Sequence, residues 1–161
     1  MPSATEQEAY ALLEKLAIPY QKVDHPAITS VKNLAIDLPG PQVKNLVLKA
    51  KKGSAIYLVI LPDEKQADLK RLAEQLEEKR LSFVSEEQLQ TLLGVSAGTV
   101  TPLALTHDTE HKITLVIDNS IDHQDTVGFH PNTNTATLII AYTDFEKLLA
   151  YLGYEPVYLS L

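Results

Sequence analysis

The stretch 43-VKNLVLKAKKGSAIYLVIL-61 decides the fold of this chain of 161 residues. It contains two runs with the residues of strands, 43–49 and 55–61, which flank the sequence Lys-Lys-Gly-Ser at 51–54. Two such runs around a short turn that contains glycine predict an antiparallel β-hairpin. Residues 56–61 are apolar at every position, so both faces of the second strand should be buried.

Amphipathic helices are predicted on both sides of this hairpin in the sequence. Apolar residues recur at the spacing of a helical stripe in three segments: 9–16, 69–76 and 145–152. The sequences Ser-Glu-Glu-Gln at 85–88 and Thr-Asp-Phe-Glu at 143–146 have the pattern of capping boxes, which mark helix starts. These signals together predict four helices.

Other residues mark where the helices begin and end. Thr5 or Ser3 is placed to cap the first helix, and Gly94 and Gly153 suit the ends of the helices that precede them. A further short helix is expected to begin at Thr29 or Ser30 and to stop at a turn that contains two prolines and a glycine.

Short β-branched or apolar runs predict the remaining strands. They occupy five segments: 20–25, 81–83, 113–118, 126–129 and 135–141. Strands and helices that alternate irregularly, with no internal repeat and no linker, indicate one α/β (α+β) domain over residues 1–161. The expected architecture is a central mixed β-sheet of about six or more strands with flanking helices.

The composition narrows the class of protein. Hydrophobic residues make up 45% of the chain and charged residues 22%, values typical of a globular protein. No apolar run approaches the ~18 residues that a membrane-spanning helix needs, the N-terminus lacks the pattern of a signal peptide, and there is no cysteine. We therefore expect a cytoplasmic protein with no membrane partner, no disulfide and no thiolate chemistry.

The charge is acidic overall but uneven along the chain. Fourteen basic and 21 acidic residues give a net charge of −7, which differs from that of a basic nucleic-acid-binding domain. Four lysines, however, fall within nine residues that contain no acid: Lys44, Lys49, Lys51 and Lys52. This local patch could meet one end of a nucleic acid, or it could be a solvated hairpin turn.

Two segments match catalytic motifs without the context that those motifs need. Residues 94–98 (GVSAG) fit the nucleophile elbow G-x-S-x-G, which requires a strand followed by a helix, whereas here a helix precedes the motif. Residues 107–111 (HDTEH) fit the zinc motif H-x-x-E-H, which requires a helix, whereas here only a turn has room before the next strand. We predict no metal site and no cofactor.

Four ordered segments carry a resemblance that covers nearly the whole chain. They are Val-Asp-His-Pro at 23–26, Lys-Asn-Leu at 44–46, Gly-Thr-Val-Thr-Pro at 98–102 and GFHPNTNTATL at 128–138. In this order and spacing the sequence resembles the YbaK-like family of aminoacyl-tRNA deacylases, which includes the editing domain of prolyl-tRNA synthetases. It looks most similar to the freestanding PrdX- or ProX-type trans-editing proteins.

The resemblance implies a fold, a reaction and a set of partners. The implied reaction is hydrolysis of the ester that joins a wrong amino acid to the 3′ end of tRNA, in particular in Ala-tRNA(Pro). An aminoacyl ester is already activated, so a positioned water and a stabilised oxyanion can suffice without a metal or a covalent nucleophile. The implied partners are the tRNA acceptor end and a prolyl-tRNA synthetase.

The same resemblance implies site residues. Lys44 corresponds to the lysine implicated in deacylation in the family, and its ammonium could hold a phosphate or polarise the ester carbonyl. The implied substrate-binding residues are Tyr20, His25, Asn45, Gly98, Thr101, Pro102, Gly128, His130 and Pro131. The glycine of the 98–102 loop allows close approach of the backbone to a ligand, and its proline fixes the exit of that loop.

Two alternatives remain open at this level. The chain could be a noncatalytic module that binds aminoacyl-tRNA or a synthetase, or it could be a deacylase of Cys-tRNA(Pro). Val47 and Leu103 stand where the family often has phenylalanine, so the amino-acid specificity is less determined than the family.

Overall fold

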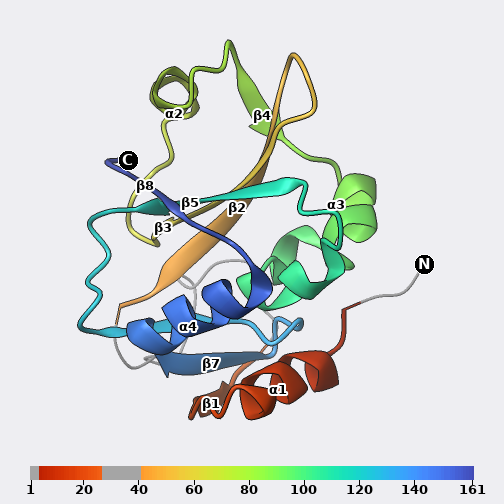
Figure 1. Ribbon diagram of the computed structural model, residues 1–161, viewed down its shortest axis with the longest axis vertical. Coiled ribbons are helices and arrows are strands. Elements are labelled where there is room, and N and C mark those ends of the chain that lie inside the picture. Colours follow the sequence, from red (N-terminus) through yellow and green to blue (C-terminus); the bar gives the residue numbers. More distant parts are fainter. Residues whose placement is uncertain (1–3, 27–40) are drawn as a thin grey trace.

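The computed structural model describes residues 4–26 and 41–161 (Figure 1). Within these residues, strands form one sheet in the order β1-β7-β6 and a second in the order β4-β2-β3-β5-β8. The predicted α+β class is confirmed, and the strands divide into a three-stranded and a five-stranded sheet. The helix expected from Thr29 or Ser30 lies outside the described residues.

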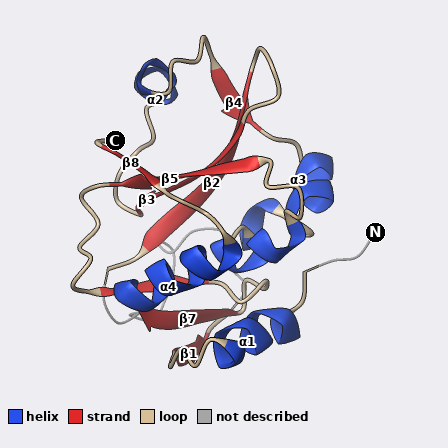
Figure 2. Cartoon of the chain, in the orientation of Figure 1, coloured by secondary structure: helices blue, strands red, loops and turns tan. Residues whose placement is uncertain are grey.

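The predicted hairpin is the centre of the larger sheet (Figure 2). Strand β2 (Val43–Ala50) pairs antiparallel with β3 (Ile56–Pro62), so that Lys44 lies opposite Leu61. The sheet continues through β5 (Ile113–Asp118), which runs parallel to β3. Its edges are β4 (Leu81–Phe83) and β8 (Val157–Leu159). The sequence analysis did not predict β8.

The smaller sheet consists of strands that are distant in the sequence. Strand β7 (Ala136–Ala141) lies in the middle, and it pairs antiparallel with β1 (Gln21–Asp24) and with β6 (Thr126–Phe129). All three strands lie within segments that the sequence predicted as strands. The sheet lies near α1, at the end of the molecule opposite β4 (Figure 1).

Burial on both faces of β3 is confirmed, and it divides the core in two. Leu58 and Ile60 belong to a large apolar cluster that also contains Phe129 and Leu138 from the smaller sheet. The alternate residues of β3 belong to a second cluster, on the face that α2 covers. Because side chains alternate along a strand, one strand supplies both cores.

Four α-helices pack against these sheets in the described part of the chain, and two 3₁₀ helices connect them. The α-helices are α1 (Glu6–Lys15), α2 (Leu69–Gln75), α3 (Glu86–Leu93) and α4 (Tyr142–Leu152). The 3₁₀ helices are η2 (Ala97–Thr99) and η3 (Pro102–His107). None of the described helices is long and apolar enough to span a membrane.

Most of the predicted helix ends are confirmed. The Thr5 hydroxyl accepts a hydrogen bond from the amide of Glu8 at 3.2 Å, and Ser85 and Gln88 form the expected capping box. Gly94 and Gly153 end α3 and α4 with φ of 70° and 87°, in the left-handed region that glycine adopts without strain.

The capping box predicted at 143–146 is wrong. Helix α4 begins at Tyr142 directly after β7, and its N-cap is Ala141, whose side chain cannot accept a hydrogen bond. Thr143 therefore already lies inside the first turn of the helix. Strand β7 runs into α4 without a connecting loop, and this junction, rather than the local capping pattern, sets the first residue of the helix.

A buried carboxylate joins the η3–β5 connection to the end of α4. Asp108 accepts hydrogen bonds from the amides of Lys112 and Ile113 at 2.9 and 3.0 Å and from the Tyr154 hydroxyl at 2.8 Å. Burial, together with the hydrogen bond and negative charge of Asp108, raises the pKa of Tyr154 well above its usual value. The ring of His111 stacks on Tyr154, with the ring centroids 4.5 Å apart.

We predict that Tyr154→Phe lowers the free energy of unfolding by about 1–2 kcal/mol, because it removes one hydrogen bond from a buried carboxylate. The measurement is urea denaturation of both proteins at neutral pH. Tyr151→Phe is the matched control, since Tyr151 is 49% exposed on the same stretch of chain. Equal losses of stability in the two variants would contradict a specific role for the Asp108–Tyr154 hydrogen bond.

Candidate functional site

The residues of the Lys-Asn-Leu motif point to opposite faces of the larger sheet. Lys44 lies opposite Leu61, which belongs to the cluster under α2, whereas Asn45 lies opposite Ile60, which belongs to the large core. Directly opposed residues share a face, so Lys44 projects away from the large core and Asn45 projects toward it. The Lys44 ammonium makes no hydrogen bond or ion pair within the described residues.

The start of β2 touches β6, and this contact brings the two sheets together at the site. The carbonyl of Gln42 accepts a hydrogen bond from the amide of Asp63, so the β2–β3 pairing extends to this residue. A Cβ atom on Gly128 would lie 3.1 Å from Oε1 of Gln42 and 2.9 Å from Cγ2 of Thr137. Glycine is therefore required at 128, because a larger residue would push these neighbours apart.

Lys44 is two residues beyond Gln42 and lies on the same face of β2. Two residues of extended strand cover about 7 Å. The Lys44 side chain therefore emerges about 7 Å from the contact between Gln42 and Gly128, on the face away from the large core.

Two histidines and a threonine lie on the outer face of the smaller sheet. His25 follows β1 and is buried, with an exposed fraction of 7%. Its Nε2 lies 2.9 Å from Oγ1 of Thr137, and its Nδ1 lies 2.9 Å from the carbonyl of Pro26. Because a carbonyl only accepts, Nδ1 donates to Pro26, and the hydroxyl of Thr137 is the partner of Nε2. Both ring nitrogens of His25 are thus already engaged.

His130 uses only one ring nitrogen, Nδ1, for hydrogen bonds to the part of the chain that the structure describes. Its Nδ1 donates to the carbonyl of Ala136 at 3.0 Å, and its ring centroid lies 6.1 Å from that of His25. Burial lowers the pKa of His130 below its ordinary value, and the proximity of His25 lowers it further, against the opposing effect of the Ala136 hydrogen bond. At neutral pH the ring is therefore uncharged, with the lone pair on Nε2.

Asn45 carries an unused hydrogen-bond acceptor on the other face of β2. Its Oδ1 is buried and has no hydrogen-bond partner. A buried acceptor without a partner costs free energy, so it is a position where a donor group of a ligand would be stabilised. The binding role of Asn45 stays a prediction, and the structure places Asn45 and Lys44 on different sides of the strand.

Hydrogen bonds within the segment 96–103 and to the preceding helix α3 hold the conformation of the 98–102 loop. Ser96 and Thr99 cap η2 reciprocally, and the amide of Ala97 donates to the Glu86 carboxylate at 3.0 Å. Thr101 is completely buried, and its hydroxyl accepts from the amide of Leu103 at the start of η3. Within the described residues, the hydrogen bonds of this loop reach neither the Lys44 nor the His130 side chain.

The remaining predicted residues lie in separate segments of the chain. Pro102 is the first residue of η3 and is buried, whereas Pro131 is buried directly after His130. The turn that follows is tied to the N-terminal segment, because the side-chain amide of Asn132 donates to the carbonyl of Thr5 at 2.8 Å. The ring of Tyr20 stacks on Tyr10 of α1, at a distance of 5.9 Å between ring centroids, and does not contact the histidines.

The two motifs that lacked a catalytic context have ordinary structural roles. Residues 94–98 follow α3 and lead into η2, so no strand precedes Ser96 as an elbow would require. His107 ends η3 and its Nε2 lies 2.6 Å from the Glu8 carboxylate, while His111 stacks on Tyr154. The two histidines therefore face different partners and do not share the face of a helix.

Sequence reasoning missed Gln42 and Thr137. Thr137 lies inside the 128–138 segment that carried the resemblance, and a threonine at a buried position of an apolar strand is a signal that it has a polar partner. Gln42 has no such signal, because only the crossing of β2 and β6 brings it to Gly128.

The sequence was compared with models of known families. Residues 25–148 match the model of the aminoacyl-tRNA editing domain. The match begins at His25 and includes every predicted site residue except Tyr20. This chain belongs to the aminoacyl-tRNA editing domain family.

Full-length relatives of this editing domain agree with that assignment. The prolyl-tRNA editing protein ProX of Acetoanaerobium sticklandii is 32% identical over 152 residues, which cover 92% of this chain and 93% of ProX. The prolyl-tRNA synthetase associated domain-containing protein 1 of Danio rerio is 33% identical over 164 residues, covering 99% of this chain and 89% of the relative.

One solved structure has the same fold over the whole length of this chain. It is described as a candidate trans-editing enzyme for prolyl tRNA synthetase and superimposes with a TM-score of 0.71, at 21% identity, over 100% of this chain and 99% of its own. At this level of identity the similarity establishes the fold.

We predict that His130 titrates below 6.5, its ordinary pKa, because burial and the proximity of His25 disfavour the charged ring. The measurement is the pH dependence of the His130 Cε1-proton resonance by NMR, assigned by its absence in His130→Gln. A midpoint above 6.5 would mean that a negative group stabilises the charged ring and would contradict the neutral His130 described above.

Proposed function

We propose that this editing domain is a trans-acting deacylase that hydrolyses mischarged Ala-tRNA(Pro) without a metal ion, in the cytoplasm. The observation that carries the proposal is the combination, around one crossing of the two sheets, of a Lys44 ammonium without a partner among residues 4–26 and 41–161 and an unprotonated Nε2 at His130. The family match and the names of the relatives support the substrate class.

Lys44 is the residue proposed to stabilise the transition state. As water attacks the ester carbonyl, negative charge develops on the carbonyl oxygen, and a nearby ammonium that makes no other ion pair stabilises this charge more than it stabilises the neutral ester. The same ammonium could instead hold the terminal phosphate and so position the ester. Both roles depend on the absence of a competing partner within the described residues.

His130 is proposed to orient the attacking water. Its Nδ1–H is bonded to the Ala136 carbonyl, which fixes the tautomer and leaves Nε2 to accept a hydrogen bond from the water. The proton of the water moves to Nε2 as the carbon–oxygen bond forms, and it then reaches the ribose oxygen as the ester bond breaks. His25 is proposed to position Thr137 rather than to touch the substrate, because both of its ring nitrogens are already hydrogen-bonded.

The proposed biological role is double-sieve editing. A synthetase site for proline cannot strongly reject alanine, because a few methylene groups are worth only about 1–3 kcal/mol. A second site that admits alanine and is too small for proline restores accuracy. The 95–103 segment is the proposed wall of this pocket: Val95, Val100 and Leu103 anchor it in the large core, whereas Ser96 and Ala97 are exposed.

A prolyl-tRNA synthetase is the proposed donor of the tRNA. Several relatives at 32–34% identity carry the name prolyl-tRNA synthetase associated domain-containing protein 1, which supports such a partner. The following experiment distinguishes the proposed enzyme from the alternative, a noncatalytic module that binds tRNA.

We predict that Lys44→Ala lowers the single-turnover rate of Ala-tRNA(Pro) deacylation by about 10²–10³-fold, the cost of removing one oxyanion contact. Lys49→Ala is the matched control, because Lys49 lies on the same strand, on the opposite face, and donates to Gln88 at 3.2 Å. Wild-type turnover by Lys44→Ala would contradict the assignment, and absence of turnover in the wild type would favour the noncatalytic module.

We also predict that alanine is removed from tRNA(Pro) at least tenfold faster than proline, because exclusion of proline is steric. The measurement is the initial deacylation rate of Ala-, Cys-, Ser- and Pro-charged tRNA(Pro), before and after exhaustive chelation. A faster rate on the cysteine ester would favour the Cys-tRNA(Pro) alternative. Comparable rates for alanine and proline would contradict editing, and a chelation loss that zinc restores would contradict a metal-independent reaction.

A further inference from the structure

Two basic turns meet at the end of the molecule that is distant from the smaller sheet. The β2–β3 turn and the connection between α2 and β4 lie side by side there (Figure 1), and the amide of Lys51 donates to the carbonyl of Arg80 at 2.9 Å. This contact brings together two pairs of exposed basic residues: Lys51, Lys52, Lys79 and Arg80. We call these four residues the basic tip.

The charges of the basic tip have no neutralising partner in the ranges 4–26 and 41–161. None of the four side chains makes an ion pair within the described residues. The acids that precede them in the sequence are Glu77 and Glu78. Glu78 is half-buried beside Tyr57, where burial and the negative charge of Glu78 raise the pKa of the tyrosine. In a chain of net charge −7, this end is therefore a local site of attraction for an anion.

An exposed aromatic ring lies beside the basic tip. Phe83 is the most exposed of the large hydrophobic residues described, at 58%, and it belongs to β4 at the edge of the larger sheet. It lies opposite Leu48 of β2, so it shares the face of the sheet to which Lys44 belongs. An exposed ring beside unpaired cations is the combination that binds single-stranded nucleic acid, by stacking on a base and attracting phosphates.

The spacing along β2 gives the distance between this surface and the proposed site. Lys44 and Leu48, the partner of Phe83, are four residues apart, which is roughly 13 Å of extended strand. Between these two points the same face of β2 is covered, because Leu48 is completely buried in the cluster under α2. The accessible surface is therefore the edge of the sheet, where Phe83 and the four cations of the basic tip are exposed.

The opposite end of β2 is unfavourable for RNA. Gln42 and Val43 line a cleft of about 410 Å³ there, together with the carboxylates of Glu64, Asp122 and Asp125 and with Lys65, whose ammonium is paired with Asp118 at 2.7 Å. These acids repel phosphate groups, whereas the basic tip attracts them. The charges at the two ends of β2 therefore give the RNA one direction of approach.

We propose that Phe83 and the basic tip bind the single-stranded 3′ end of tRNA, with one base stacked on Phe83 and the adjoining phosphates held by the four cations. This inference rests on the proposed function for the identity of the RNA. The surface itself is defined by its ring and its charges, so it can be tested without hydrolysis.

The experiment measures binding of an uncharged RNA hairpin with a four-nucleotide 3′ overhang, by fluorescence anisotropy as a function of salt. Phe83→Leu should weaken binding by about 5- to 100-fold, and Phe83→Trp should retain it, because the stacking surface remains. Lys51→Ala combined with Lys52→Ala should reduce the slope of log affinity against log salt by about 1.4. A blunt hairpin should be insensitive to Phe83→Leu.

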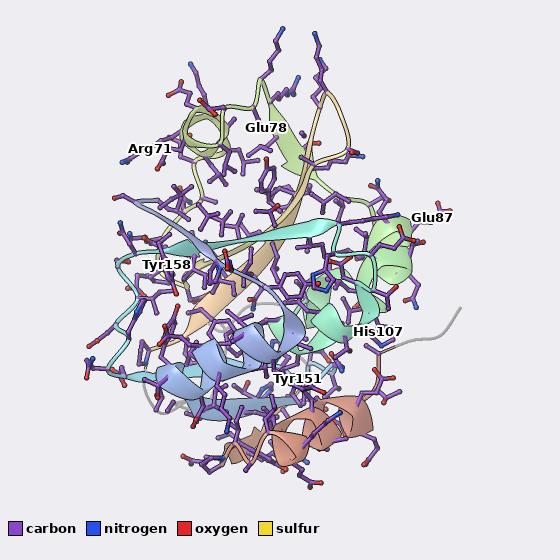
Figure 3. The ribbon with its side chains drawn as sticks, viewed as in Figure 1. Arg71, Glu78, Glu87, His107, Tyr151 and Tyr158 are labelled. Carbon is purple, nitrogen blue, oxygen red and sulfur yellow. The ribbon has the colours of Figure 1, made fainter. Side chains whose placement is uncertain are left out.

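The controls are Tyr151→Leu and Lys112→Ala. Tyr151 is an exposed ring near α1, far from Glu78 at the α2 end of the molecule (Figure 3), and Lys112 is exposed and pairs with Glu110. Neither control should change RNA binding. Unchanged binding by Phe83→Leu, or an equal loss in Phe83→Leu and Phe83→Trp, would overturn the stacking surface.

The two proposals fail in different ways. If Ala-tRNA(Pro) is hydrolysed while the variants bind RNA as the wild type does, the surface is overturned and the proposed function stands. If the variants lose overhang binding as expected while the wild type hydrolyses no ester, the surface stands and the deacylase is overturned. Variants that lose capture of prolyl-tRNA synthetase with RNA binding intact would overturn the surface in favour of a protein partner.

Discussion

Burial of β3 on both faces is the constraint on which the rest of the structure depends. Five consecutive residues of this strand are buried, and alternate side chains enter the large core and the smaller cluster under α2. Neither core could form without this strand, because each needs apolar side chains from the same backbone. The hairpin then determines the direction of β2 and the positions of its polar residues.

The candidate site is a consequence of that arrangement. Because β2 is paired with β3 without interruption from Val43 to Lys49, the face to which Lys44 projects is determined by its partner Leu61. The start of the same strand crosses β6 at Gly128, where the Thr137 and His25 side chains lie on the other sheet. One strand thus links the proposed catalytic ammonium, the histidine cluster and, at its other end, the basic tip.

Local patterns predicted most of the secondary structure correctly, and the errors have physical reasons. The hairpin, the Ser85 capping box and the glycine helix ends depend on interactions within a few residues, and all are confirmed. The capping box at 143–146 failed because β7 runs directly into α4. Strand β8 was missed because its three residues are largely exposed and have no alternating pattern, so only pairing with β5 makes them a strand.

The sequence by itself determined the family, the α+β class and the residue types of the site, because ordered motifs and apolar periodicity are local properties of the chain. Only the tertiary structure decided that Lys44 and Asn45 face opposite sides and that Phe83 lies beside the basic tip. It also decided that both nitrogens of His25 are bonded, while Nε2 of His130 has no hydrogen-bond partner among the described residues. Strand register, tautomer and exposure depend on residues that are distant in the sequence, and those partners exist only after folding.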